Sequence, residues 1–187
     1  MNYINKELPD FDVKAYHKGE LVNYKKNDLL GKWSILFFYP ADFSFVCPTE
    51  LEDLESSYSE FKKNNAEIYS VSVDSEFSHM SWAQNTDTIS KIEYPMLSDQ
   101  KHELADFFDL IEEESGRAYR GVFIINPEGV IKSYTINAMG IGRNAQEILR
   151  TLQAAQFVAE NGDNVCPANW HPGEKTIKPG ADLVGKI

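Results

Sequence analysis

Cys47 has the sequence surroundings of a reactive thiol. It lies in the run FYPADFSFVCPTE (residues 38–50), directly after an apolar stretch typical of a strand and directly before a predicted helix. A cysteine at a helix start meets unpaired backbone N–H groups and the positive end of the helix dipole, and both favour the thiolate. Because the thiolate is the nucleophilic form, this position predicts a nucleophile. The alternative is a buried structural thiol, since free cysteine is among the most buried residue types.

The only other cysteine, Cys166, lies far along the chain in a segment rich in proline and glycine. Taken alone, it is interpreted as an incidental tail cysteine. Two cysteines without a Cys-x-x-Cys spacing argue against a stabilising disulfide framework and against that redox motif. A zinc site needs about four ligands, whereas the four histidines are scattered along the chain: His17, His79, His102 and His171. We therefore expect no bound metal.

Charge and hydropathy argue against two classes of partner. The 18 basic and 29 acidic residues give a net charge of −11 without a basic stripe, so we expect no nucleic-acid partner. The first residues lack the basic start and apolar stretch of a signal peptide. The longest apolar run, residues 33–39, is too short to cross a bilayer. These features predict a cytoplasmic protein that binds no membrane.

The elements that must position Cys47 follow from the hydrophobic pattern. The run WSILFFY (residues 33–39) is short, apolar and rich in aromatic residues, which predicts a central strand. Pro48 suits the first turn of the helix that follows. One face of that helix carries apolar residues at steps of three and four, namely Leu51, Leu54, Tyr58 and Phe61. Further strands are expected at 67–73, 94–97, 121–126 and 130–136, and further helices after Asp74 and Ser75, around 102–108 and over 144–160.

This order of elements predicts an α/β fold with a mixed central sheet flanked by helices, as in a thioredoxin-like arrangement. The last two strands flank Pro127-Glu128-Gly129, which is a hairpin signal. We expect a thioredoxin-like domain over residues 1–160 and a C-terminal tail over 161–187. Glycines and prolines exclude long regular elements from the tail. The tail is either disordered or docked, for instance on another subunit, and Trp170 favours docking as an apolar anchor.

Three residues before the helix form a recognisable pattern. Pro40, Ser44 and Cys47 fit Pro-x-x-x-Thr/Ser-x-x-Cys, which resembles the active-site loop of peroxiredoxins. The resemblance extends over essentially the whole chain, because VCPANW (165–170) and LVGKI (183–187) also look like segments of typical 2-Cys peroxiredoxins. In that chemistry Pro40 would shield the thiolate from water, the Ser44 hydroxyl would hydrogen-bond the thiolate and the peroxide, and Cys47 would attack one peroxide oxygen.

The resemblance gives Cys166 a second interpretation, as the resolving cysteine. Peroxide attack would leave Cys47 as a sulfenic acid, which condenses readily with another thiol and is otherwise exposed to further oxidation. The resemblance implies that this thiol comes from a partner subunit. A disulfide needs Cα atoms within about 7 Å of each other, so both segments would have to loosen before the bond forms.

The resemblance also bears on the charged residues. Arg120 taken alone is a solvated surface charge, but the matching family arginine lies beside the nucleophile, where it favours the thiolate and orients peroxide. Arg117 fits that role less well. Arg143 is left open between a helix-start residue and part of a supporting network. Glu50 is either a salt-bridge partner of the arginine or a partner of the helix dipole.

Three further side chains have open interpretations. His79 has no convincing partner in the sequence, so we interpret it as structural. Trp82 and Trp170 are either simple core residues or pack near the Cys47 loop and the Cys166 tail, where their fluorescence would report oxidation.

The resemblance implies a thiol peroxidase that reduces hydrogen peroxide and organic hydroperoxides to water or alcohols and so protects against oxidative stress. It implies electrons from NADH through a flavoprotein disulfide reductase, no bound cofactor, and homodimers that assemble into a decamer. A 1-Cys peroxidase that does not use Cys166 is one rival. An oxidation-dependent holdase or redox-signalling scaffold is the other.

Two departures from the family pattern matter. Ser44 stands where much of the family has threonine, so the hydroxyl is kept but the methyl that stiffens the rotamer is lost. We expect at most a modest slowing. The segment EEESGR (112–117) stands where overoxidation-sensitive members have Gly-Gly-Leu-Gly. The tail should therefore release easily and let Cys166 trap the sulfenic acid before it is oxidised further.

Overall fold

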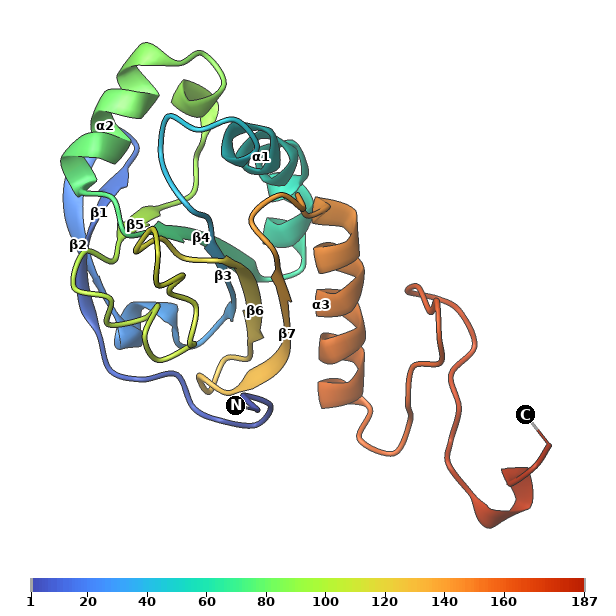
Figure 1. Cartoon of the computed structure of the whole chain (residues 1–187). Coiled ribbons are helices and arrows are strands. Elements are labelled where there is room, and N and C mark those ends of the chain that lie inside the picture. The colour runs from blue at the N-terminus through green and yellow to red at the C-terminus, as the bar shows by residue number, and fades with distance from the viewer. Residues whose placement is uncertain (1, 187) are drawn as a thin grey trace. The chain divides into compact units, whose positions relative to one another are not determined.

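The computed structural model describes residues 2–186 and divides into two compact units that meet between Ala145 and Gln146. The first unit carries a single mixed sheet (Figure 1). The second unit contains most of the long C-terminal helix and the segment after it. The domain boundary expected after residue 160 stays a prediction, but in the structure this helix and the tail form one unit.

Seven strands of the described residues form one sheet in the order β2-β1-β5-β4-β3-β6-β7. The parallel pairs are β3 with β4 and β4 with β5, and the other pairs are antiparallel, so the predicted mixed sheet is confirmed. The strands are β1 (Asp12–His17), β2 (Glu20–Lys25), β3 (Trp33–Phe38), β4 (Ala66–Ser72), β5 (Met96–Ser98), β6 (Arg120–Ile125) and β7 (Ile131–Asn137).

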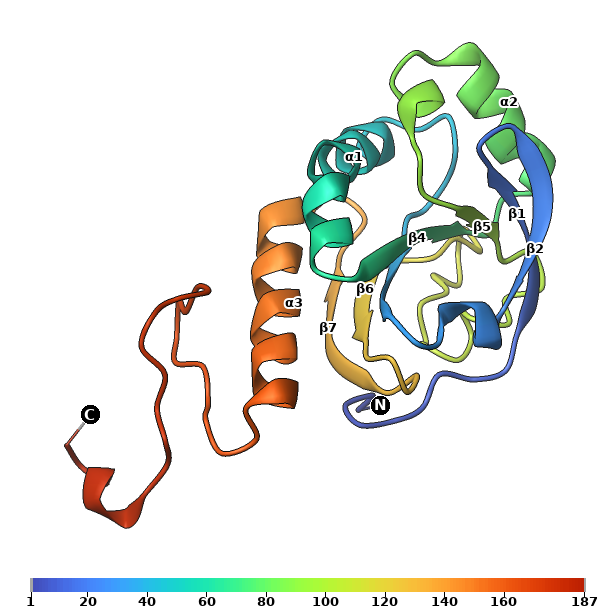
Figure 2. The same ribbon diagram turned by 180° about the vertical axis from the view of Figure 1, so that it is seen from behind.

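Two helices of the first unit lie on one face of this sheet, as Figures 1 and 2 show. They are α1 (Cys47–Lys63) and α2 (Glu76–Asn85). Both crossovers, β3-α1-β4 and β4-α2-β5, step in the same direction along the sheet. Right-handed parallel crossovers that step in the same direction place their helices on the same face. Along the chain, α1 is the first helix after the carboxyl end of strand β3.

Strand β3 lies inside the sheet, between β4 and β6, and both of its faces are buried. Leu36 and Phe38 point into a core cluster that also includes Leu104, Ala105 and Phe108. Residues of a strand alternate between its two faces, so Ile35 and Phe37 face the side that carries α1. Beyond Phe38 the chain leaves the strand and leads to Cys47 at the start of α1.

The prediction of a helix around residues 102–108 is wrong. The segment forms consecutive turns, with a positive φ of 59° at His102. The buried Asp99 carboxylate accepts hydrogen bonds from the backbone N–H groups of Leu104 and Ala105. These side-chain bonds and the left-handed residue interrupt the i to i−4 ladder, of which the bonds from Asp106 to His102 and from Phe108 to Leu104 are present. The apolar spacing in this segment reports burial against the sheet rather than helical structure.

The N-terminal hairpin of β1 and β2 was not predicted. Lys18 and Gly19 both have positive φ, 49° and 91°, at the turn between the two strands. This is the conformation of a two-residue type I′ turn, whose twist matches that of the strands. The hairpin extends the sheet through the antiparallel pairing of β1 with β5.

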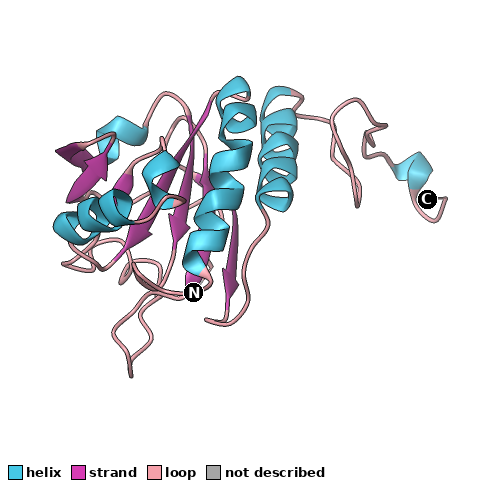
Figure 3. Cartoon of the chain, turned by 90° about the horizontal axis from the view of Figure 1, so that it is seen from above, coloured by secondary structure: helices cyan, strands magenta, loops and turns pink. Residues whose placement is uncertain are grey.

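The second unit consists of most of α3 (Ala145–Glu160) followed mainly by loop, as Figure 3 shows. The loop is held by an antiparallel bridge between Val165 and Ile177. The ring of Trp170 lies 5.0 Å from that of Phe157, centroid to centroid. Trp170 is therefore an anchor within this unit. Among residues 2–186, no helix combines the length and apolar character needed to span a bilayer.

Candidate active site

Cys47 is the first residue of α1, and its side chain is fully buried. Pro48 follows it in the first turn, where the missing N–H of proline costs no helical bond. The sulfur lies at the positive end of a helix of 17 residues, a position that stabilises negative charge. The helix start predicted at Cys47 is confirmed.

Arg120 is the cation beside this sulfur. Its Nη1 donates to Cys47 Sγ at 3.4 Å, and its Nε donates to the Met139 carbonyl oxygen at 2.6 Å. The register of the sheet explains the position: Phe37 of β3 pairs with Val122 of β6, so Arg120 lies beside the end of β3. The side chain is buried rather than solvated. The structure thus brings together the two residues that the sequence interpretation paired.

Glu50 holds Arg120 and a second arginine in the same buried cluster. Its Oε2 accepts from Arg120 Nη1 at 2.6 Å, and its Oε1 accepts from Arg143 Nε at 2.9 Å. The Arg143 guanidinium also donates to the Gly121 carbonyl oxygen and lies 3.4 Å from the centroid of the Phe37 ring. Of the two interpretations left open for Glu50, the salt bridge is the observed one.

The charged groups beside Cys47 do not cancel one another. Two guanidinium groups face one carboxylate, so one positive charge is left to be balanced in a buried site. Burial lowers the pKa of the Arg143 guanidinium, while its bonds to Glu50 oppose that shift. The Arg120 end of this cluster lies against Cys47 Sγ. Arg143, left open by its sequence, is part of the network that fixes Arg120.

A pocket of about 480 Å³ opens onto Cys47. Its wall includes Pro40, Ser44 and Arg120, so all the predicted site residues of the first unit meet here. Arg117 also lines the pocket, but its side chain is exposed and no hydrogen bond from it to the sulfur is present among residues 2–186. The structure therefore separates the two arginines as the sequence interpretation expected.

Ser44 differs from expectation in its hydrogen bond. Its hydroxyl donates to the Ala41 carbonyl oxygen at 2.7 Å rather than to the Cys47 sulfur. A serine hydroxyl has one hydrogen to donate and two lone pairs to accept with. The carbonyl three residues earlier takes that hydrogen, which leaves the Ser44 oxygen on the pocket wall as an acceptor.

Cys166 lies in the second unit, in the loop after α3. It is a free thiol whose Sγ lies 3.9 Å from the Ala154 carbonyl oxygen, a weak contact. Burial raises the pKa of the Cys166 thiol, and the Arg150 cation offsets part of that shift. The thiol form is therefore favoured at Cys166.

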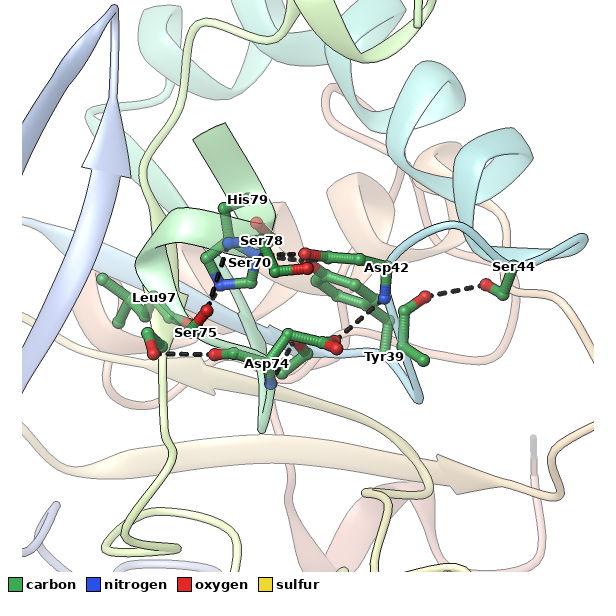
Figure 4. A network of polar contacts seen from close by, with 12 residues as sticks. Tyr39, Asp42, Ser44, Ser70, Asp74, Ser75, Ser78, His79 and Leu97 are labelled. Atoms are coloured by element: carbon green, nitrogen blue, oxygen red, sulfur yellow. Dashed lines mark hydrogen bonds and ion pairs between the residues drawn. The ribbon is translucent and has the colours of Figure 1, made fainter. Parts of the chain in front are cut away.

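Sequence reasoning missed a buried network behind the Cys47 loop. His79, interpreted as a structural residue without a partner, lies with its Nδ1 2.8 Å from the Asp42 carboxylate. Tyr39 donates its hydroxyl to the same carboxylate (Figure 4). Trp82 packs its ring against those of Tyr39 and Phe43, so it is both a core residue and a neighbour of the Cys47 loop. An acidic residue inside an apolar run was the only sequence signal.

No group of three or more histidine, cysteine or acidic side chains within residues 2–186 is arranged to hold a metal ion. The chemistry of the described site rests on the sulfur, the hydroxyl and the guanidinium groups. Together they place a thiol, a hydrogen-bond acceptor and a fixed cation around a small open pocket.

Comparisons with known proteins agree with this geometry. A sequence model of the AhpC/TSA family matches residues 4–134, and one of the C-terminal domain of 1-Cys peroxiredoxin matches residues 154–186. The crystal structure of Enterococcus faecalis AhpC matches with a TM-score of 0.87 and 59% identity, covering 89% of this chain and 100% of that one. The reduced 2-Cys peroxiredoxin of Plasmodium vivax matches with a TM-score of 0.92 and 30% identity, covering 97% and 96%.

The chain therefore belongs to the AhpC/TSA family of peroxiredoxins, which are thiol peroxidases, and has their thioredoxin-like fold. Its curated relatives include proteins named alkyl hydroperoxide reductase C. That of Bacillus subtilis is 49% identical and that of Staphylococcus aureus (strain Mu50) is 48% identical, each over the full length of both chains.

Proposed function

We propose that Cys47 is the peroxide-attacking residue of this thiol peroxidase and that its substrates are hydrogen peroxide and organic hydroperoxides. The single observation that carries the proposal is the buried contact of Arg120 Nη1 with Cys47 Sγ at 3.4 Å. The same guanidinium is fixed by Glu50, so it does not have to reorganise during the reaction.

In the first step the Cys47 thiolate attacks one peroxide oxygen and the O–O bond breaks. The sulfur becomes a sulfenic acid, and the other oxygen leaves as an alkoxide or hydroxide that takes up a proton to give alcohol or water. Arg120 stabilises the charge that moves onto the leaving oxygen. The Ser44 oxygen accepts the peroxide O–H, and Pro40 limits the access of water to the thiolate.

In the second step the Cys166 thiol of a partner subunit attacks the sulfenic sulfur. A Cys47–Cys166 disulfide forms and one water leaves. Because the Cys47 side chain is buried in the first turn of α1, that turn has to unwind before its sulfur can meet another thiol. The loop position of Cys166 and its weak contact with Ala154 support its role as the more easily released partner.

Thiol–disulfide exchange then restores both thiols. We assign the electrons to NADH through a flavoprotein disulfide reductase, with no cofactor bound to this chain. The name alkyl hydroperoxide reductase C of the curated relatives supports a reductase system acting on hydroperoxides. The proposal includes homodimers that assemble into a decamer in the cytoplasm, where the enzyme protects against oxidative stress. Within the described residues, no observation favours a holdase or signalling scaffold instead.

A coupled assay tests this cycle. NADH oxidation is followed with hydroperoxide and candidate flavoprotein reductases, for the wild type, Cys47→Ser and Cys166→Ser. We expect turnover only with the wild type, and a dimer on non-reducing gels that requires both cysteines. Activity that survives Cys47→Ser would overturn the assignment of the nucleophile. Full turnover by Cys166→Ser would instead establish the 1-Cys cycle.

A further inference from the structure

The peroxide pocket is supported from behind by the buried network of Figure 4. We propose that Asp42 and His79 are positioning residues for the peroxide reaction, because they hold the turn of residues 39–44 in the shape that places Pro40 and Ser44 on the pocket wall. This inference rests on the proposed peroxidase function. It adds two residues that do not touch the substrate.

Asp42 closes the turn and ties it to two other parts of the fold. Its Oδ1 accepts from the Tyr39 hydroxyl within the turn, and its Oδ2 lies against His79 Nδ1, each at 2.8 Å. Its backbone N–H donates to Asp74 Oδ2 at 2.9 Å. The Asp42 side chain is 1% exposed, although it belongs to a turn that borders an open pocket. The turn is thus bound to the segment after β4 and to α2.

His79 passes this support on to the sheet. Its Nε2 lies 3.2 Å from the carbonyl oxygen of Leu97 in β5. The Asp42 carboxylate lies 2.8 Å from Nδ1, so both ring nitrogens have a polar partner. A fully buried imidazole with both nitrogens satisfied is a rigid link between β5 and the turn.

The other side of the same turn forms the pocket. Pro40, Ala41 and Ser44 line it, and Ser44 is held by its bond to the Ala41 carbonyl oxygen. Phe43 has a φ of 51°, a left-handed conformation that costs energy for a residue other than glycine. Such a conformation persists only where the surroundings enforce it. In this turn, the Asp42 bonds supply that constraint directly beside Phe43.

The position of the turn matters for peroxide more than for the thiol itself. The contact of Arg120 with Cys47 comes from β6 and α1 and does not pass through the turn. Releasing Asp42 should therefore leave the thiolate intact and displace the Ser44 acceptor. A displacement of about 1 Å can lower a reaction rate roughly a hundredfold when the reacting groups must be aligned.

Two rate constants separate these effects. Cys47 oxidation by hydrogen peroxide is followed through Trp82 fluorescence in a Cys166→Ser background, and alkylation by iodoacetamide measures the thiolate without needing peroxide alignment. For Asp42→Ala we expect the ratio of the peroxide rate to the alkylation rate to fall at least about thirtyfold. For Asp42→Asn the ratio should stay within about threefold of wild type, because the amide can accept from Tyr39 and donate to His79 Nδ1.

Asp99→Ala is the matched control. Asp99 is an equally buried carboxylate, but it holds the backbone of Leu104 and Ala105. Its loss should leave the ratio unchanged. The proposal is wrong if Asp42→Ala keeps the ratio of this control, or if both rates fall in parallel.

A second variant covers the case in which Asp42→Ala does not fold. Burial and the Asp42 carboxylate raise the pKa of Tyr39, so its hydroxyl stays a donor. Tyr39→Phe removes the hydrogen bond to Asp42 together with the longer 3.4 Å contact with His79 Nδ1, and it should lower the ratio about three- to tenfold. An unchanged ratio would overturn the proposal. If the wild type itself does not reduce peroxide through Cys47, the proposed function fails instead.

Discussion

The two cysteines of this chain lie in opposite kinds of surroundings. Cys47 is fully buried, begins a long helix and contacts a guanidinium that a buried carboxylate holds in place. Cys166 is half-buried in a loop, and its sulfur makes a weak hydrogen bond to the Ala154 carbonyl oxygen at 3.9 Å. The Cys47 sulfur has a fixed cation as its neighbour, whereas the Cys166 sulfur has a weak hydrogen bond.

This difference matches a division of chemical labour. Attack on peroxide needs a thiolate and a fixed cation at the moment when charge moves. Resolution of a sulfenic acid needs a thiol that can reach it, because sulfenic acids condense readily with thiols. The thiol at Cys166 has to move to its target, whereas movement at Cys47 would lose the alignment with peroxide. Each of the following experiments alters either the Cys47 site or the Cys166 thiol.

Replacing the cation at Cys47 should have the largest effect. For Arg120→Gln we expect the rate constant of Cys47 oxidation by peroxide to fall about a hundred- to a thousandfold, since one preorganised donor is lost. Arg117→Gln is the control, because Arg117 lines the same pocket without a hydrogen bond to the sulfur. Stopped-flow fluorescence measures both variants. Equal losses would mean that general positive charge, and not the contact, activates Cys47.

The pH dependence of resolution should be the next largest effect. Burial raises the pKa of the Cys166 thiol. Below that pKa, each unit of rising pH increases the thiolate fraction, and so the rate of disulfide formation, about tenfold. Quenched-flow trapping of the disulfide between about pH 6 and pH 8 measures the slope. A flat profile would show that unwinding of the Cys47 segment, rather than Cys166 ionisation, limits this step.

The smallest effect should come from Ser44→Thr. The hydroxyl is retained and still reaches the Ala41 carbonyl, while the methyl group restricts its rotamer. We expect the peroxide rate constant to rise by no more than about threefold. Ser44→Ala serves as the control and should be slower than wild type, because the acceptor is lost. A strong decrease in the threonine variant would contradict the account of this residue.

Much of the first unit was predictable because its signals are local. The apolar run of β3, the proline after Cys47 and the hairpin turn each act within a few residues, and all three predictions are confirmed. The pairing of Cys47 with Arg120 was expected only from the family resemblance. In the structure it depends on the register between β3 and β6.

The elements that were missed depend on contacts between distant residues. The 102–108 segment has helical spacing, but the Asp99 carboxylate takes two of its backbone N–H groups. The Asp42–His79 pair joins a turn to a helix 37 positions later, and no periodic pattern marks such a pair. The sequence pattern did not show which acceptor takes the Ser44 hydrogen, and in the structure it is the Ala41 carbonyl oxygen.

The most direct test follows a single turnover in the Cys166→Ser variant. One equivalent of hydrogen peroxide is added in the presence of a sulfenic-acid trap, and mass spectrometry locates the adduct. The account predicts one adduct per chain, at Cys47, and no peroxide consumption by Cys47→Ser. Peroxide consumed without an adduct at Cys47, or consumed equally fast by Cys47→Ser, would contradict it.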